Sequence, residues 1–219
     1  MLNKYHLSSI IILALFVVLA VLVSPLANNN HGLIANDTSA FLKINDSHVA
    51  FLNNFMIYLT KFGREAFWIA TTILLFILGG MAGKKTAIVL VLAFIVIIPI
   101  GYAAKDLVQR ERPIVPDSDV IIAPDSDFSF PSGHATIVSA GAAIALALFR
   151  DSKRKLAISL ALTGEAALVC ISRVYVGGHY PLDVVGGILL GVGISFIFIG
   201  TTRQVERITQ FIARTLGRK

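Results

Sequence analysis

Residues 172–183 read SRVYVGGHYPLD, and they place Arg173, His179 and Asp183 between two long apolar runs. Ionisable groups inside a membrane are costly, and they are retained mainly where they face a site, a partner or a water-filled cavity. This stretch therefore predicts both the build of the chain, with a span on either side of a short polar turn, and the location of its chemistry.

Composition predicts that the chain lies in a lipid bilayer. Of its 219 residues 56% are hydrophobic and only 15% are charged, whereas about 25% are charged in an average soluble domain. The formal net charge of +6 does not indicate a nucleic-acid-binding protein, because the basic residues are divided among short segments between apolar runs. The single cysteine, Cys170, excludes an internal disulfide and a Cys-based zinc site, and its apolar surroundings indicate a small buried residue.

Six apolar stretches approach the roughly 20 residues that a spanning helix needs. They cover about 7–27, 65–83, 86–104, 132–149, 156–173 and 183–202. The first stretch follows Lys4 and could instead be a signal peptide, which would leave five spans, but its length favours a span. Gly187 and Gly191 have the small-xxx-small spacing of closely packed membrane helices. The predicted fold class is an all-α integral membrane protein with six transmembrane helices.

The lysines and arginines follow the positive-inside rule if both termini are cytoplasmic. The inner segments then carry most of the 19 basic residues, at Lys4, Lys84, Lys85, 150–155 and the basic tail 203–219. Residues 41–60 place apolar side chains at near-helical spacing and predict one amphipathic helix on the outer surface. No linker or repeat divides the sequence, so residues 1–219 are expected to form a single domain.

With this topology, three polar segments reach the outer face, at residues 105–113, 130–135 and 172–183. Lys105, Arg112 and Arg173 bring cations to this face, and guanidinium groups match the oxygens of a phosphate. A helix that begins near Pro131 would add free backbone N–H groups and the positive end of its dipole. The combination predicts a site for a multiply charged anion.

His179 and Asp183 are four residues apart, so in the first turn of a helix beginning near Pro181 the carboxylate can reach one imidazole nitrogen. That contact selects a tautomer and leaves the other nitrogen as a nucleophile or a base. His134 is a second histidine on the same predicted face. Two histidines with several cations, and without evident metal ligands, favour phosphoryl transfer through a phosphohistidine.

Together, Lys105-x6-Arg112-Pro113, Pro131-Ser132-Gly133-His134 and Ser172-Arg173-x5-His179-x3-Asp183 resemble the complete three-part signature of the type 2 phosphatidic acid phosphatase (PAP2) superfamily. Each motif alone is weak, but the three in order on one predicted membrane face are specific, and no motif position departs from the pattern. The motifs cover 105–183, and the six predicted spans extend the resemblance to most of the chain. The resemblance implies a PAP2/haloperoxidase-like helical bundle with its site at the outer leaflet.

The resemblance also implies a role for each motif residue. His179 would be the nucleophile, Asp183 its orienting partner, and His134 the general acid for the leaving oxygen. The residues that would hold the phosphoryl group are Lys105, Arg112, Ser132, Gly133 and Arg173. Because the family works without a metal ion, no metal and no other cofactor is expected.

The expected function is that of a metal-independent lipid phosphatase or diphosphatase in the cell membrane, with its site on the extracytoplasmic side. The substrate would keep its tail in the bilayer and present its phosphate groups at the site. A polyprenyl diphosphate is favoured over phosphatidylglycerol phosphate and phosphatidic acid, because the small chain with short loops is similar to microbial family members.

Other functions remain as alternatives. The chain could be a non-catalytic lipid-phosphate binder or transporter, in which the cations would matter and the His179–Asp183 pair would not. The cations could also be interfacial anchors whose charged ends snorkel to water. Vanadate-dependent haloperoxidases share a similar motif set, but they are soluble, and the six spans argue against them.

Two acidic features lie outside the motifs. Glu165 falls near the middle of the fifth span and is expected to be a protonated or hydrogen-bonded packing residue. The loop before Pro131 carries Asp117, Asp119, Asp125 and Asp127, whose spacing does not match an EF-hand loop. These four carboxylates are expected to be solvated.

Overall fold

Helices make up all the regular structure in the residues that the computed structural model describes, which are 4–25, 31–46, 48–115, 120–123 and 125–215. In chain order they are α1 (Lys4–Val23), α2 (His31–Asn45), α3 (Ala50–Phe62), α4 (Glu65–Leu78), α5 (Gly80–Val108), α6 (Gly133–Leu148), α7 (Lys153–Tyr175) and α8 (Pro181–Thr215). Of the residues predicted as a basic tail, 216–219 lie outside the described part of the chain.

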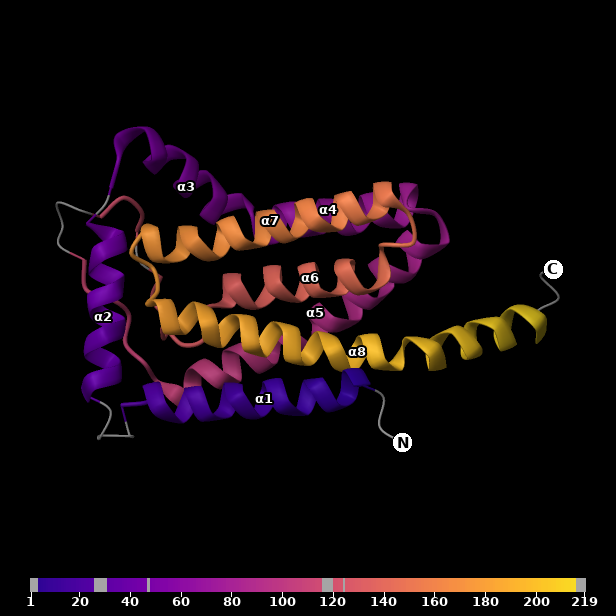
Figure 1. Ribbon diagram of the computed structural model, residues 1–219, viewed down its shortest axis with the longest axis horizontal. Coiled ribbons are helices and arrows are strands. Elements are labelled where there is room, and N and C mark those ends of the chain that lie inside the picture. The colour runs from indigo at the N-terminus through magenta and orange to yellow at the C-terminus, as the bar shows by residue number, and fades with distance from the viewer. Residues whose placement is uncertain (1–3, 26–30, 47, 116–119, 124, 216–219) are drawn as a thin grey trace.

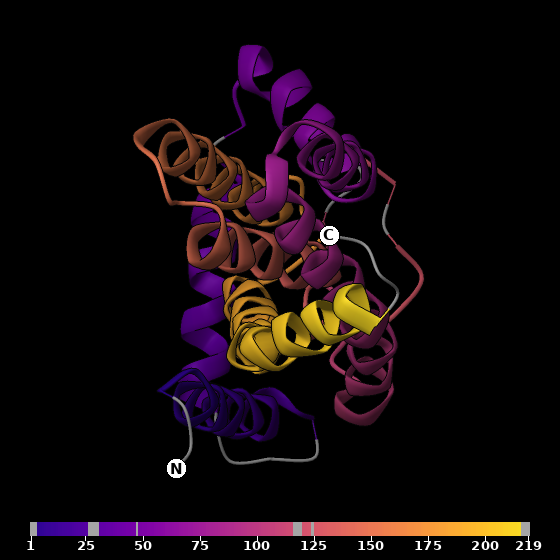
Figure 2. The same cartoon turned by 90° about the vertical axis from the view of Figure 1, so that its right-hand side faces the viewer.

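The helices α1 and α4 to α8 run along a common axis, and α2 crosses one end of the bundle (Figure 1). α6 is the central helix, since it packs against α5, α7 and α8. Figure 2, which looks along the bundle, shows α1 on the opposite side of α8 from α6, and α1 and α8 are in extensive contact. α1 begins at the end of the bundle far from α2, and α8 ends beyond that same end (Figure 1).

Four helices are long and apolar enough to cross a membrane: α1, α5, α7 and the Pro181–Thr202 part of α8. α4 and α6 are apolar but shorter, with 14 and 16 residues, or about 21 and 24 Å at 1.5 Å per residue. All six predicted spans therefore fall on apolar helices, of which four reach the length that a bilayer of about 30 Å demands.

The turn between α4 and α5 lies earlier than the predicted loop between the second and third spans. Gly80 adopts a positive φ of 63°, a conformation that glycine reaches without steric cost, and α5 starts there. Lys84 and Lys85 therefore belong to the first turns of α5. The far end of α5 extends to Val108, where Gln109 in a left-handed conformation ends the helix before Arg112.

The prediction of one amphipathic helix over residues 41–60 is wrong, because α2 ends at Asn45 and α3 begins at Ala50. The break is held by contacts with the end of α7. Asn45 donates its amide to the Tyr175 carbonyl at 3.1 Å, and His48 Nε2 lies 2.7 Å from the same oxygen. Val49, extended at φ −121°, donates its N–H to the Tyr175 hydroxyl. These tertiary bonds outweigh the local helical periodicity.

The two glycines predicted to permit close packing lie where α8 crosses α6. A Cβ at Gly187 would meet the carbonyl oxygen of Ser132 and the methyl group of Ala135, and one at Gly191 would overlap the carbonyl oxygen of Thr136. Ser195, one turn after Gly191, donates its hydroxyl to carbonyl oxygens on both helices. The absence of side chains thus lets the two backbones touch, as small residues do in membrane bundles.

Glu165 and Cys170 both lie on α7. Cys170 is buried and free, as predicted for a small apolar residue. The Glu165 carboxylate faces Gly63 between α3 and α4, and neither of its buried oxygens has a hydrogen-bond partner among the described residues. The predicted packing role fits this position, but no bond accompanies it.

Because the α6–α8 contact has no space for a side chain, Gly191→Ala should lower the stability of the protein by about 1–3 kcal/mol, the usual cost of overpacking. Gly164→Ala is the matched control, since a Cβ there meets nothing within 4 Å and alanine favours a helix. Thermal unfolding in detergent measures both variants. Equal midpoints for the two variants would contradict the close packing.

Candidate active site

The three polar segments come together at the end of the bundle that α2 crosses. Lys105 lies at the end of α5, His134 at the start of α6, Arg173 at the end of α7 and Asp183 at the start of α8. Four helices thus end or begin around one buried group, the imidazole of His179, which is only 1% exposed. The convergence at one face that the sequence predicts is therefore present.

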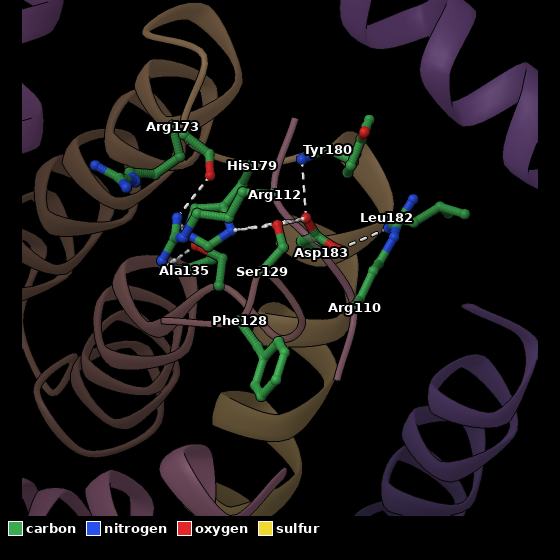
Figure 3. Close-up of polar contacts among 12 residues, drawn as sticks. Arg110, Arg112, Phe128, Ser129, Ala135, Arg173, His179, Tyr180, Leu182 and Asp183 are labelled. Carbon is green, nitrogen blue, oxygen red and sulfur yellow. Dashed lines mark hydrogen bonds and ion pairs between the residues drawn. The ribbon is translucent and has the colours of Figure 1, made fainter. Parts of the chain in front are cut away.

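His179 and Asp183 are linked through a third residue. Asp183 Oδ2 lies 3.7 Å from His179 Nδ1, and Ser129 Oγ lies between them, 3.3 Å from that nitrogen and within hydrogen-bond distance of Oδ2. The Tyr180 N–H also donates to Oδ2, at 2.9 Å. Figure 3 shows His179, Ser129 and Asp183 in this row. In this network Ser129 donates its hydroxyl proton to the Asp183 carboxylate, so its oxygen accepts a hydrogen bond from the protonated Nδ1 of His179.

That arrangement leaves Nε2 as the nitrogen with the lone pair, and Nε2 faces cations. Arg112 Nη1 lies 3.3 Å from Nε2 and donates to the Gly178 carbonyl at 2.7 Å. The turn that presents the imidazole depends on Gly177, with φ of 81°, and on Gly178 and His179 donating to the Arg173 carbonyl. An unprotonated nitrogen held beside a guanidinium can attack an anion that the guanidinium binds.

Two carboxylates of the loop before α6 pair with the three cations that are predicted to bind phosphate. Asp127 binds Lys105 at 2.9 Å and also pairs with Arg112. Asp125 lies 2.9 Å from Arg173 and 3.3 Å from Arg112. The prediction that the loop carboxylates are solvated is thus incomplete, because Asp125 and Asp127 are half-exposed but form ion pairs with the cations of the site. Asp117 and Asp119 lie outside the described residues.

His134, at the start of α6, contacts the junction between α3 and α4. Its Nε2 is 3.0 Å from the Thr60 carbonyl at the end of α3, and its Nδ1 is 3.4 Å from Arg64 Nη1 before α4. Thr60 Oγ1 also accepts from Arg173 Nη1 at 3.0 Å. The α3–α4 junction therefore orients both His134 and one of the site cations.

Ser132 and Gly133 have different positions. The Ser132 side chain is fully buried and caps α6 by accepting from the Ala135 N–H, while its own N–H donates to the Asp183 carbonyl at 2.9 Å. Gly133 lines the open space beside His134. Ser132 therefore connects the start of α6 with the start of α8 through its backbone hydrogen bond. Gly133 has no side chain, so a ligand in the cavity can approach its backbone closely.

A cavity of about 870 Å³ extends from this polar end between α4, α5 and α6. Its polar wall includes His179, His134, Arg112 and Lys105. Most of the apolar lining comes from α4 and α5, at Trp68, Ile69, Ile73, Val91, Phe94, Ile97 and Ile98, and Ile137 of α6 adds to it. A ligand with a charged head and a hydrocarbon tail matches both parts of this lining.

Burial and the surrounding cations Arg173, Arg112 and Lys105 hold the pKa of His179 well below its usual range. The imidazole is therefore neutral, as a nucleophile must be. Burial raises the pKa of Asp127, but the bonds from Lys105 and Arg112 outweigh burial and bring it to about 2. The loop carboxylate is therefore ionised whenever it pairs with these cations.

The described residues contain no group of three His, Cys, Asp or Glu side chains placed to hold a metal ion. The chemistry of the donor groups agrees with this, because the histidine nitrogen that remains free faces arginine and lysine. Lysine and arginine in these positions bring positive charge to any anion that binds there.

Sequence reasoning missed several residues that the fold brings to the site. Arg110 has no role among the motif residues, yet it is 5% exposed and binds both Asp183 and Asp37 at 2.6 Å. Ser129 precedes the second motif by only two residues, so its position next to the motif was the available signal. No sequence signal pairs Arg110 with Asp37, since they are 73 residues apart.

Comparisons with known proteins agree with this geometry. A family model described as the PAP2 superfamily matches residues 84–207. The undecaprenyl-diphosphatase of Sulfolobus acidocaldarius is 37% identical over 206 residues, which cover 92% of this chain and 96% of that protein. Undecaprenyl-diphosphatase BcrC of Bacillus subtilis is 29% identical over 169 residues, with 76% and 83% covered.

Among solved structures, the transmembrane PAP2-type phosphatidylglycerolphosphate phosphatase of Bacillus subtilis superposes with a TM-score of 0.73. It is 25% identical in sequence, and the match covers 90% of this chain and 96% of that one. LpxE of Aquifex aeolicus superposes with a TM-score of 0.58 at 26% identity, over 74% and 93% of the two chains.

The pairing of Asp127 with Lys105 and Arg112 implies competition with any phosphate for the same N–H groups. Asp127→Asn should therefore tighten the binding of inorganic phosphate about 1.5-fold to fivefold, the range for partly exposed ion pairs. The fluorescence of Trp68, the only tryptophan in the chain and part of the cavity wall, can follow the titration.

Asp151→Asn is the control, because Asp151 pairs with Lys155 at the opposite end of the bundle and the change removes the same charge. Weaker phosphate binding by Asp127→Asn than by this control would mean that Asp127 supports the anion site instead of competing with its ligand.

Proposed function

The chain belongs to the PAP2 superfamily, and from this premise we propose that it is a membrane diphosphatase that removes the terminal phosphate of a polyprenyl diphosphate through a phosphohistidine on His179. The observation that carries the proposal is the position of His179 Nε2. It faces Arg112 at 3.3 Å on the polar wall of a cavity whose remaining wall is mostly apolar. A phosphate bound by Arg112, Lys105 and Arg173 would present its phosphorus to this nitrogen.

In the first step, the Nε2 lone pair forms a bond to the terminal phosphorus as the bond to the bridging oxygen breaks. The leaving polyprenyl phosphate takes up the electron pair and a proton from His134. Lys105, Arg112 and Arg173 would stabilise the charge on the equatorial oxygens. Asp183, acting through Ser129, would stabilise the positive charge that the imidazole acquires.

In the second step, water attacks the phosphorus, the P–N bond breaks, and its electron pair returns to Nε2. His134 accepts the proton of the attacking water, which restores the starting state. Arg64, 3.4 Å from His134, disfavours a charged imidazole there, so the negative charge of the substrate would be needed for His134 to carry the proton.

The apolar wall supports a long tail as the other part of the substrate. Most of the lining residues of α4 and α5 are aliphatic or aromatic, and several of them, such as Ile69 and Ile73, are also exposed on the outside of the bundle. The similarity over nearly the whole chain to an undecaprenyl-diphosphatase supports a polyprenyl tail. Phosphatidylglycerol phosphate and phosphatidic acid carry the same head chemistry and are the next candidates.

We place the site on the extracytoplasmic side, with six spans and both termini in the cytoplasm. The distribution of lysine and arginine supports this orientation. The alternative of a non-catalytic lipid-phosphate binder or transporter needs the cations but gives no reason for the row of His179, Ser129 and Asp183.

An assay of phosphate release in detergent with EDTA tests the reaction. The wild type should release phosphate from a polyprenyl diphosphate, and His179→Ala should lose activity by a thousandfold or more, on the order seen for nucleophile variants. His134→Ala should lose about a hundredfold to ten-thousandfold, as for a general acid–base residue. When the terminal phosphate of the polyprenyl diphosphate carries a label, the wild-type protein should become labelled by forming the phosphohistidine, and His179→Ala should not.

His31→Ala is the matched control, since His31 is exposed at the start of α2. Undiminished release by His179→Ala would sink the phosphohistidine mechanism. A wild-type protein that binds these lipids and releases no phosphate from any of them would favour the binder. Loss of activity with EDTA would contradict a metal-independent reaction.

Cysteine labelling tests the orientation. In a Cys170→Ala background, Phe51→Cys on α3 and Asp151→Cys before α7 place exposed thiols at opposite ends of the bundle. A membrane-impermeant maleimide should label Phe51→Cys in intact cells and Asp151→Cys only after lysis. The reverse pattern would invert the topology.

A further inference from the structure

A buried arginine outside the phosphate-binding set connects the His179–Asp183 pair to α2. Arg110 donates from Nη1 to Asp183 Oδ1 and from Nη2 to Asp37 Oδ2, both at 2.6 Å. Its guanidinium carbon lies 4.3 Å from the centre of the Tyr180 ring. Figure 3 shows Arg110 on the side of Asp183 that faces away from His179. Arg110 therefore does not face the reacting nitrogen, and it acts on the site only through Asp183.

This contact determines how the Asp183 carboxylate is turned. Oδ1 is taken by Arg110, while Oδ2 accepts from Ser129 and from the Tyr180 N–H. With one oxygen held in each direction, the plane of the carboxylate cannot rotate, and Oδ2 stays directed at Ser129 and His179. Asp183 has no exposed surface, so water cannot replace a lost partner at low cost.

Asp37 completes the arrangement from α2. Its Oδ2 binds Arg110, and its Oδ1 accepts from the Leu182 N–H at 3.0 Å, in the first turn of α8. A carboxylate at the N-terminus of a helix is favourable because of the free N–H groups and the helix dipole. Asp37 thus holds Arg110 and the start of α8 together, and its side chain is only 2% exposed.

The charges in this cluster do not cancel. Burial raises the pKa of Asp37, and the bonds from Arg110 and the Leu182 N–H oppose that shift. With both carboxylates ionised, the one positive charge of Arg110 and the two negative charges of Asp37 and Asp183 give the cluster one net negative charge on the Nδ1 side of His179. On the Nε2 side, the imidazole faces Arg112, with Arg173, Lys105 and Asp127 nearby. A net negative charge behind the ring opposes these cations and favours the positive imidazole of the phosphorylated state.

We propose that Arg110 and Asp37 are positioning residues for His179: Arg110 orients Asp183, and Asp37 both holds Arg110 and keeps the cluster negative. The inference rests on the proposed function of His179 as nucleophile. Neither residue touches the cavity wall that would receive the phosphate, so both act on the rate of phosphoryl transfer and leave the binding of the lipid almost unchanged.

Steady-state kinetics of the full-length protein over a range of pH tests this inference with four variants at Asp37 and Arg110 and one control variant. Asp37→Asn keeps the shape and brings the cluster to zero charge. It should lower kcat about tenfold or more, leave KM within about twofold, and move the acid limb of kcat/KM to lower pH, because a less negative cluster disfavours the protonated imidazole. Asp151→Asn, at the far end of the bundle, should match the wild type.

The Arg110 variants separate charge from geometry. Arg110→Lys keeps the positive charge but not the two-pronged guanidinium, so kcat should fall while the acid limb stays in place. Arg110→Met leaves two carboxylates without their cation and should lose about a hundredfold in kcat, as for misplaced catalytic groups. Adding Asp37→Asn to Arg110→Met restores one net negative charge, so the double variant should recover part of the kcat that Arg110→Met loses.

Wild-type kcat and an unmoved acid limb in Asp37→Asn would overturn the inference, as would a double variant slower than Arg110→Met alone. Thermal midpoints in detergent show whether each variant is folded. If Asp37→Asn is unfolded, the kcat of Arg110→Lys relative to the wild type tests the positioning role. These outcomes differ from failure of the proposed function, which would appear as no phosphate release by the wild type.

Discussion

Pairing of buried cations is the constraint on which the rest of this structure depends. Lys105, Arg110 and Arg173 are each less than a tenth exposed at the end of an apolar bundle, where an unpaired charge is too costly to keep. The loop carboxylates Asp125 and Asp127 and the helix residues Asp37 and Asp183 supply their partners. Because these acids come from α2, α8 and the loop before α6, the ion pairs require those segments to meet where α5 and α7 end. The fold and the candidate site are therefore consequences of the same set of contacts.

The cations form two groups with different surroundings. Arg110 lies between carboxylates that are themselves almost fully buried, and this group is joined to the Nδ1 side of His179. Lys105, Arg112 and Arg173 are paired with half-exposed carboxylates on the Nε2 side, next to the cavity. Water reaches the second set of carboxylates, so in the proposed reaction a phosphate would displace them, whereas the first set has no such access. The proposal thus divides the charged residues into a buried group that would orient His179 and a partly exposed group that would bind the phosphate.

The similarity to other PAP2 proteins extends beyond the motifs. The family model matches residues 84–207, whereas α2, α3 and α4, which supply Asp37, Thr60 and Arg64, precede it. The superposition on the phosphatidylglycerolphosphate phosphatase of Bacillus subtilis covers 90% of this chain, so the shared architecture extends beyond the residues that the family model matches. In this chain the N-terminal helices contribute both the apolar wall of the cavity and the contacts that orient His134 and Asp183.

The sequence by itself determined the membrane class, the apolar helices and the three motif segments, because hydrophobic length and short residue spacing are local properties. It also placed His179 next to Asp183, since four residues span one helical turn. Only the tertiary structure decided what lies between and behind them: Ser129 bridging the pair, Arg110 turning the carboxylate, and Asp37 reaching it from α2. It likewise divided residues 41–60 into two helices around Tyr175. Ion pairs and hydrogen bonds between segments 50 to 145 residues apart leave no periodic trace in a sequence, because they depend on which helix ends the bundle brings together.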